Sequence, residues 1–546
     1  MAVRPARRLF IFAGHRECLR EDGRFFADLA RDAGVGYGFP GHTGREREDF
    51  IMSKAFEKLE PYMERAMALQ TAQVLFEWDN ETLAPREAAP YTAKVVGTLS
   101  EEYQRIITGG QVRKLLEKCE KAGDLTERER AIVREMKEEC GRLASIPPKE
   151  YGEFSRLKAE AASVWVRARE KKDFSMFAPT LRRIVEFEKR FAGYRAKKGQ
   201  RLYDVMLDEY EKGFSMETLD KFFGELKEHL VPLLREITDK CASVEDGFLS
   251  GDFPDEAQQR AAKLLAEYVG FNFERGVMAL SAHPFTTNLH NHDVRITTHY
   301  GRRMDSSMFS VIHEAGHGVY EMGIRDDLTQ TPAGQGASMG MHESQSRFFE
   351  NILGRSEAFW EPIYGEIQEI FPGLSDVPLD KFIRAVNKVK PGLIRTEADE
   401  LSYCLHIMIR YEIEKMLIEE DLDVDRLPEV WNTKYEEYLG VRPDNDAVGV
   451  LQDIHWSQGS IGYFPSYALG SAIGAQLFSH MKKSMDMDAL LRQGRISVIR
   501  EYLRDHVHQY GKMKTTREIL MDTTGEDFNP RYYVKYLEEK YRRLFG

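Results

Sequence analysis

The pentapeptide His313-Glu314-Ala315-Gly316-His317 combines two imidazoles and a carboxylate at a spacing suited to metal-dependent hydrolysis. Residues four apart lie on the same face of a helix, so His313 and His317 can bind one metal ion together. Glu314 is displaced from that face and can reach a water molecule beside the metal instead. The pattern therefore predicts a zinc peptidase centre in which Glu314 is the general base.

The surrounding residues favour a buried helix for this motif. Asp305-Ser306-Ser307 is typical of a helix start, and the stretch Met308 to Ile312 supplies an apolar face leading into the histidine pair. Gly316 and Gly318 each cost a helix about 1 kcal/mol relative to alanine, which predicts close approach of a neighbouring segment. Two surface histidines on an ordinary amphipathic helix are the alternative interpretation.

A catalytic zinc usually has three protein ligands and one open position, so the histidine pair needs a partner. We expect Glu343, because it precedes the amphipathic stretch Arg347 to Leu353 and would project from a second helix. Glu350 is the second choice, and both glutamates could instead be solvated surface charges. The expected cofactor is Zn²⁺, which Co²⁺ or Mn²⁺ can replace in such sites.

Seven short segments with distinctive residue patterns follow one another along the chain. They are His283-Pro284-Phe285, Asp293 to Thr297, His313 to His317, His342 to Ser346, Ile394 to Glu400, Gly449 to Trp456 and Gly462 to Tyr467, and Phe76 to Thr82 is an earlier one. In this order they resemble the carboxypeptidase Taq family of zinc metallocarboxypeptidases. The resemblance covers the chain from about residue 52 to the C-terminus.

This resemblance implies an all-α, two-lobed fold with a deep active-site groove and a small β-sheet beside it, related to angiotensin-converting enzyme and neurolysin. Local signals agree with a mainly helical chain. Thr126 to Glu129 reads as a capping box, and Pro147-Pro148 restarts the chain into a long helical pattern. Alternation through Val294, Ile296 and Thr298 is the clearest strand signal.

The resemblance also implies roles for residues outside the zinc motif. His455, Tyr463 and Tyr467 are the expected donors to the carbonyl oxygen as it gains negative charge. Each tyrosine could equally be a core aromatic residue. His283 and His342 could contact substrate, orient their neighbours or satisfy a core hydrogen bond.

An enzyme that acts at a peptide's C-terminus must recognise a free carboxylate, which the arginine guanidinium matches with two parallel hydrogen bonds. Arg295 and Arg395 are the two candidates, and their spacing does not decide between them. Acidic residues in the same segments could instead orient the zinc-bound histidines. The candidates for that role are Asp293, Glu397, Asp399 and Glu400.

Composition limits the class of protein. The 546 residues include 42% hydrophobic ones, enough for a large core, and residues 52–546 contain no linker that divides them, so we expect one catalytic domain. A net charge of −12 without long basic runs disfavours nucleic acid or a membrane as partner. Five separated cysteines and the lack of a signal sequence or long apolar run predict a cytoplasmic protein.

Residues 1–51 differ from the rest, being rich in Arg and Gly and free of Lys. We interpret them as an N-terminal extension, either disordered or the product of a start codon assigned too far upstream of Met52.

Three functions remain open. A metallocarboxypeptidase, expected as a homodimer by resemblance, would release single residues from the C-terminus of peptides. An oligopeptidase that cuts within short peptides would use the same chemistry. A catalytically silent scaffold with structural zinc is disfavoured by Glu314, since a structural site needs no general base.

Overall fold

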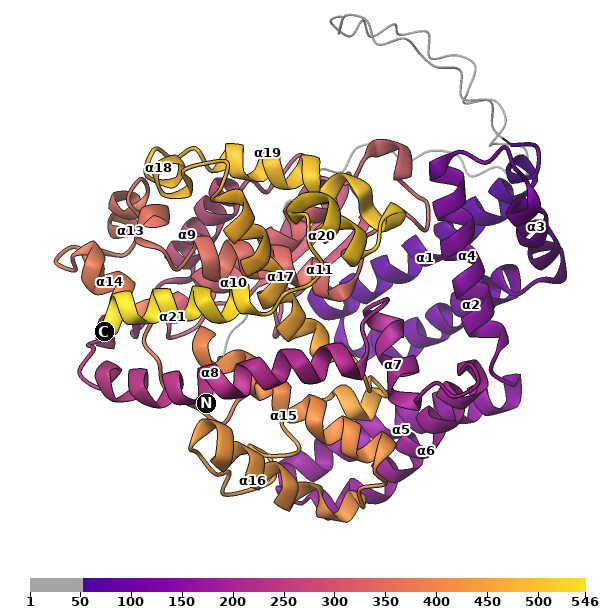
Figure 1. The fold of residues 1–546 in the computed structure, drawn as a ribbon, viewed down its shortest axis with the longest axis horizontal. Helices are drawn as coiled ribbons and strands as arrows, with labels where there is room; N and C mark the ends of the chain where they lie inside the picture. Colours follow the sequence, from indigo (N-terminus) through magenta and orange to yellow (C-terminus); the bar gives the residue numbers. More distant parts are fainter. Residues whose placement is uncertain (1–52) are drawn as a thin grey trace, which may run out of the picture. The chain divides into compact units, whose positions relative to one another are not determined.

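Helices dominate the computed structural model, which describes residues 53–546 (Figure 1). The first part of this region forms α1 (Phe56–Thr82), α2 (Ala89–Ile107), α3 (Gly110–Lys121), α4 (Glu127–Ala144), α5 (Pro148–Lys171), α6 (Ala178–Arg195), α7 (Leu202–Tyr210), α8 (Met216–Cys241) and α9 (Asp255–Val269). The predicted mainly helical fold with a small sheet is confirmed. The predictions for residues 1–51 lie outside the described residues.

Three strands interrupt the helical order and precede the helix with the histidine pair. They are β1 (Gly276–Leu280), β2 (Thr286–His290) and β3 (Asp293–Thr298), in the spatial order β1-β3-β2. The central strand β3 runs parallel to β1 and antiparallel to β2, with Ile296 opposite both Met278 and Thr286. Val294, Ile296 and Thr298 are buried, so the predicted strand is confirmed.

The remaining chain is again helical and carries most of the distinctive segments. It forms α10 (Met304–Met322), α11 (Met339–Arg347), a π-helix (Phe348–Leu353), α12 (Glu357–Trp360), α13 (Tyr364–Ile370), α14 (Leu379–Val386), α15 (Glu400–Glu419), α16 (Leu427–Leu439), α17 (Pro465–Met481), α18 (Met487–Arg492), α19 (Ile496–His506), α20 (Thr516–Thr524) and α21 (Arg531–Phe545). The last helix, α21, lies beside α8 and α17 (Figure 1).

Helix ends follow local chemistry where the sequence supplies it. Thr126 and Glu129 form the predicted capping box at the start of α4, and α5 begins at Pro148 as expected. The helix α10 begins at Met304, before the predicted Asp305 to Ser307 start, and the side chain of Arg303 at its N-cap accepts no hydrogen bond from the first turn. Asp305 instead lies in the first turn, where a negative charge stabilises a helix.

Buried apolar residues form two clusters in the described region. The larger one extends from α5 to α21 and includes β3, α10 and α17. The smaller one joins α1, α3 and α4 with Ile324, Leu328, Ala333 and Met513. Within residues 53–546, no helix combines the length and apolar character needed to cross a membrane.

Three of the distinctive segments meet where α1 packs on the sheet. The ring of Trp78 lies 5.6 Å from that of Phe285, and the Arg295 guanidinium lies 5.7 Å from the Trp78 ring. Thr297 Oγ1 accepts from the Phe285 amide at 2.9 Å and from Ser281 Oγ at 2.7 Å. The loop with His283 is therefore fixed to β3 and α1.

Candidate active site

Helix α10 brings His313, Glu314 and His317 into a crowded interior. A Cβ at Gly316 would lie 2.8 Å from Ser346 Cα, and one at Gly318 would lie 2.7 Å from the Phe271 ring. These glycines allow α11 and Phe271 to approach α10 closely, which confirms the prediction made from their helix cost.

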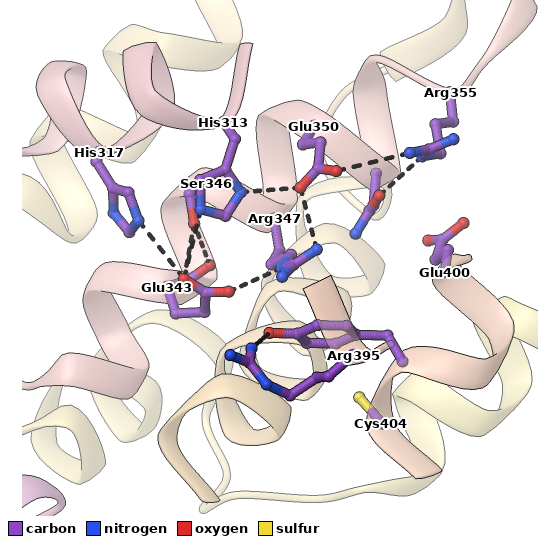
Figure 2. A network of polar contacts seen from close by, with 12 residues as sticks. His313, His317, Glu343, Ser346, Arg347, Glu350, Arg355, Arg395, Glu400 and Cys404 are labelled. Carbon is purple, nitrogen blue, oxygen red and sulfur yellow. Dashed lines mark hydrogen bonds and ion pairs between the residues drawn. The ribbon is translucent and has the colours of Figure 1, made fainter. Parts of the chain in front are cut away.

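Glu343 of α11 lies opposite the two histidines (Figure 2). Its Oε2 is 3.6 Å from His313 Nε2 and 3.5 Å from His317 Nε2, and potential ligand atoms of the three residues lie within 4.8 Å of one another. Ligand atoms around a tetrahedral zinc, about 2.1 Å from the metal, are roughly 3.4 Å apart. Two imidazole nitrogens and one carboxylate oxygen at this separation fit the donor set of a zinc site.

Glu350 contacts the opposite side of the same histidine. Its Oε2 lies 2.8 Å from His313 Nδ1, as Figure 2 shows. An ionised carboxylate can only accept, so His313 donates through Nδ1, and a neutral His313 then has its lone pair on Nε2, which faces Glu343. Glu350, the second choice as a metal ligand, therefore orients His313 and is not one of the three residues whose potential ligand atoms lie together.

Arg347 connects the two glutamates. It donates from Nε to Glu343 Oε1 at 2.8 Å and from Nη1 to Glu350 Oε2 at 3.1 Å (Figure 2). Burial alone would raise the pKa of Glu350, but Arg347 and His313 lower it to about 2. The pKa of Glu343 is likewise held below its usual range against burial, by the charges of Arg347 and His313. Both carboxylates are therefore ionised at neutral pH.

The stretch after Arg347 differs from its prediction. We expected residues 347–353 to be amphipathic, but Phe348 to Leu353 form a π-helix whose members are all buried. Its polar residues, Glu350 and Asn351, have partners inside the protein. A charge pattern that is typical of a solvated face can equally serve a buried polar network.

Glu314 is buried beside the group of three and has a neighbour on the sheet. Thr286 Oγ1 lies 2.5 Å from Glu314 Oε2 and 3.1 Å from its carbonyl oxygen. Burial raises the pKa of Glu314, and the nearby His313 opposes this. A carboxylate with a raised pKa is suited to accept and release a proton.

His455, Tyr463 and Tyr467 lie together. His455 Nε2 is 3.2 Å from the Tyr467 hydroxyl, and the His455 and Tyr463 rings stack with centroids 5.7 Å apart. Burial, followed by the charge of Arg395, lowers the pKa of His455 to about 4. Burial raises the pKa of Tyr463 to about 12, and burial also raises the pKa of Tyr467 well above its usual value. The imidazole is therefore neutral and both phenols are protonated at neutral pH.

The two candidate arginines have different surroundings. Arg395 is buried and donates to Asp453 Oδ1 from Nε at 3.0 Å and Nη2 at 2.9 Å, while Arg410 pairs with the other Asp453 oxygen. Arg295 donates to Asp293 through Nε and Nη2, and its side chain is 20% exposed compared with 8% for Arg395. His283 is exposed on the loop between β1 and β2.

Three of the four acidic residues proposed to orient the histidines have other partners. Asp293 pairs with Arg295, Asp399 caps α15 through the Ser402 amide, and Glu400 pairs with Lys540. These three predictions are therefore wrong, since the imidazoles instead contact Glu350 and His342. Residue choice for such contacts depends on packing between distant segments, which local sequence does not specify.

Sequence reasoning missed Thr286, Arg347 and Glu321. Glu321 contacts His342 Nε2 at 2.7 Å, and His342 in turn contacts His317. A spacing of four residues from His313 through His317 to Glu321 is a signal that could have found it, because all three lie on one face of α10.

A mainly helical fold with this group of residues is typical of metal-dependent peptide hydrolases. Comparison with known proteins gives the same class: the model of the carboxypeptidase Taq (M32) metallopeptidase family matches residues 58–541, and the chain belongs to this family. The predicted resemblance is confirmed. The chain is thus a peptide hydrolase of the metallocarboxypeptidase class, and its family implies a divalent metal and peptide substrates.

Relatives match nearly their whole length. Carboxypeptidase 1 of Bacillus subtilis is 41% identical over 487 residues, which are 88% of this chain and 97% of that protein. A solved structure of Pyrococcus furiosus carboxypeptidase is 34% identical with a TM-score of 0.88, covering 90% of this chain and 100% of that one. The structure of the M32 carboxypeptidase from Deinococcus radiodurans has 32% identity, the same coverage and the same TM-score.

Proposed function

We propose that this protein is a zinc-dependent carboxypeptidase that releases single amino acids from the C-terminus of peptides. His313, His317 and Glu343 would hold the metal, which when bound polarises the scissile carbonyl and lowers the pKa of the attacking water. The supporting observation is that the Nε2 atoms of His313 and His317 both face the Glu343 carboxylate, and that Glu314 is buried beside them.

Glu314 is the proposed general base. It accepts the proton of the attacking water and then delivers it to the departing amine. Its burial supports this role, because it raises the pKa of the carboxylate toward the range in which both transfers are possible. Thr286 holds the carboxylate through a single hydrogen bond to Oε2, which leaves Oε1 available to the water.

Tyr463, Tyr467 and His455 are the proposed donors to the carbonyl oxygen. Both phenols stay protonated at neutral pH and can donate to developing negative charge. Burial is the main cause of both raised pKa values, and the negative charge of Glu343 contributes to each. His455 is neutral and contacts the Tyr467 hydroxyl, so it can fix the direction of that donor.

For recognition of the substrate carboxylate we favour Arg295 over Arg395. Asp453 and Tyr403 occupy Nε and both terminal nitrogens of Arg395. Arg295 has a more exposed side chain and keeps Nη1 free of partners among residues 53–546. His283, exposed on the adjoining loop, is a second proposed substrate contact.

Digestion of one peptide with a free C-terminus and its amidated twin tests the function. Zinc-loaded protein should remove residues stepwise from the free acid only, and a chelator should abolish the cleavage. Internal cuts in both peptides would favour the alternative, an oligopeptidase. Cleavage of neither peptide by zinc- or cobalt-loaded protein would contradict the proposal and favour the silent scaffold.

Assembly and location are separate proposals. We propose a cytoplasmic homodimer, which rests on the family resemblance and on the separated cysteines. Light scattering of the purified chain tests the dimer, and fractionation of its native cells tests the location.

A further inference from the structure

The second histidine of the pair has an unusual partner. His313 contacts a carboxylate directly, whereas His317 Nδ1 lies 2.6 Å from Nδ1 of another histidine, His342. At this separation one nitrogen must carry the hydrogen and the other must accept it. The question is which of the two imidazoles donates.

Glu321 decides the direction. Its carboxylate accepts from the Gly336 amide at 3.2 Å and from Asn288 Nδ2, and it lies 2.7 Å from His342 Nε2. An ionised carboxylate only accepts, so His342 donates to it through Nε2. A neutral His342 then has its lone pair on Nδ1, and His317 must donate from its own Nδ1. The lone pair of His317 is thereby placed on Nε2, the atom that faces Glu343.

The surroundings hold this chain of contacts in place. Glu321 is only 4% exposed. A Cβ at Gly336 would lie 2.7 Å from the His342 ring and 3.4 Å from Glu321 Oε1, so the glycine leaves room for both side chains. The Tyr320 ring covers His342 at 5.1 Å between centroids.

We propose that Glu321 is a positioning residue that acts through His342 to fix the tautomer and orientation of His317 for metal binding. This inference rests on the proposed function, because it takes His317 as a metal ligand. Partners of this kind typically change metal affinity by about 10- to 100-fold. Glu321 is buried, does not belong to the three proposed ligands, and lies one helical turn beyond His317.

The test measures the zinc dissociation constant of the metal-free protein by competition with a fluorescent chelator. We expect His342→Phe to weaken binding 10- to 100-fold, because His317 loses its acceptor. His342→Asn should bind within about threefold of the unaltered protein, because the amide oxygen can accept in place of Nδ1. Equal weakening by both variants would overturn the proposal.

A double-variant cycle tests whether Glu321 acts through His342. We expect Glu321→Gln alone to weaken zinc binding about tenfold. Added to His342→Phe, it should weaken zinc binding no further. Additive losses would overturn the proposal. Glu129→Gln is the matched control, since it removes the charge of another buried glutamate, in α4, whose partners are Ser53 and Thr126, and it should leave zinc affinity unchanged.

A further variant separates this inference from the proposed function. His317→Ala should abolish tight zinc binding if His317 is a ligand. Loss of binding in His317→Ala together with unchanged affinity in His342→Phe would overturn the inference alone. Retained tight binding in His317→Ala would instead contradict the ligand set on which both depend.

Discussion

Gly470 of α17 packs directly against Glu343 of α11. A Cβ at this glycine would lie 2.5 Å from both Cβ and Cγ of Glu343, closer than real side chains approach. The backbone of α17 therefore packs directly against the side chain of Glu343, the proposed metal ligand. Together with Gly316, which admits α11 on the other side, Gly470 fixes where Glu343 can lie.

Gly470→Ala should displace Glu343 and weaken zinc binding. Overpacking of this kind typically costs about 1–3 kcal/mol, so the melting temperature should also fall. Gly474→Ala is the matched control on the same helix, because its nearest neighbours are Ser344 O at 3.1 Å and Ile352 Cδ1 at 3.6 Å. Chelator competition and thermal unfolding measure both variants. Equal zinc affinities would contradict the role assigned to Gly470.

Glu314→Gln should lower kcat by roughly 10²–10⁴-fold, the usual contribution of a general base. The amide has a similar shape but cannot accept the proton. Zinc content should be unchanged, because Glu314 is not one of the three converging residues. Steady-state kinetics and elemental analysis measure the two quantities. A variant with more than a tenth of the original kcat would exclude Glu314 as the base.

Thr286→Val should lower kcat about tenfold or more, since a hydrogen bond to a charged group contributes roughly 1.5–3 kcal/mol. Valine has nearly the same shape but cannot donate to Glu314 Oε2. Thr286→Ser keeps the hydroxyl and should retain most of the activity. Kinetics of the pair, with zinc affinity as a check, separate the hydrogen bond from packing. Similar kcat values in the two variants would argue against an orienting role for Thr286.

His455 should make unfolding depend on pH. Burial and Arg395 lower its pKa to about 4, below the 6.5 of an ordinary histidine. Between these values the unfolded chain binds more protons than the native state, so stability falls as the pH drops from 6.5 to 4. The loss from this residue is at most about 3 kcal/mol.

His455→Gln should remove that part of the pH dependence. The free energy of unfolding in urea, measured at pH 7.5 and 4.5, should differ less between the two pH values in this variant. His229→Gln, at an exposed histidine, controls for the loss of an imidazole. Unchanged pH dependence in His455→Gln would contradict the lowered pKa.

The helices and the histidine pair could be predicted because their signals are local. A capping box at Thr126 and a spacing of four between His313 and His317 each depend on residues within one or two turns. Glu343 also came from the sequence, because it precedes an amphipathic stretch and was expected to project from a second helix. The structure places these three residues together, but their role as ligands stays a prediction.

The contacts around the three residues could not be predicted in the same way. His313 is oriented by Glu350, and Glu343 is held by Arg347 and by Gly470, which is more than a hundred residues away. Acidic residues in the resembling segments were the natural candidates, yet Asp399 and Glu400 serve a helix cap and a lysine. Packing between distant helices selects such partners, and a single sequence does not encode it in a readable pattern.

Because Phe348–Leu353 form a π-helix, the position of Glu350 depends on the number of residues in this turn as well as on their side chains. A π-helical turn contains about one residue more than an α-helical turn, and Glu350 lies within it. Deleting one residue here would let the turn close as an ordinary helix and rotate Glu350 away from His313. Side-chain substitutions in this stretch can be accommodated by repacking, but a single-residue deletion would change the direction of the side chains within the turn itself.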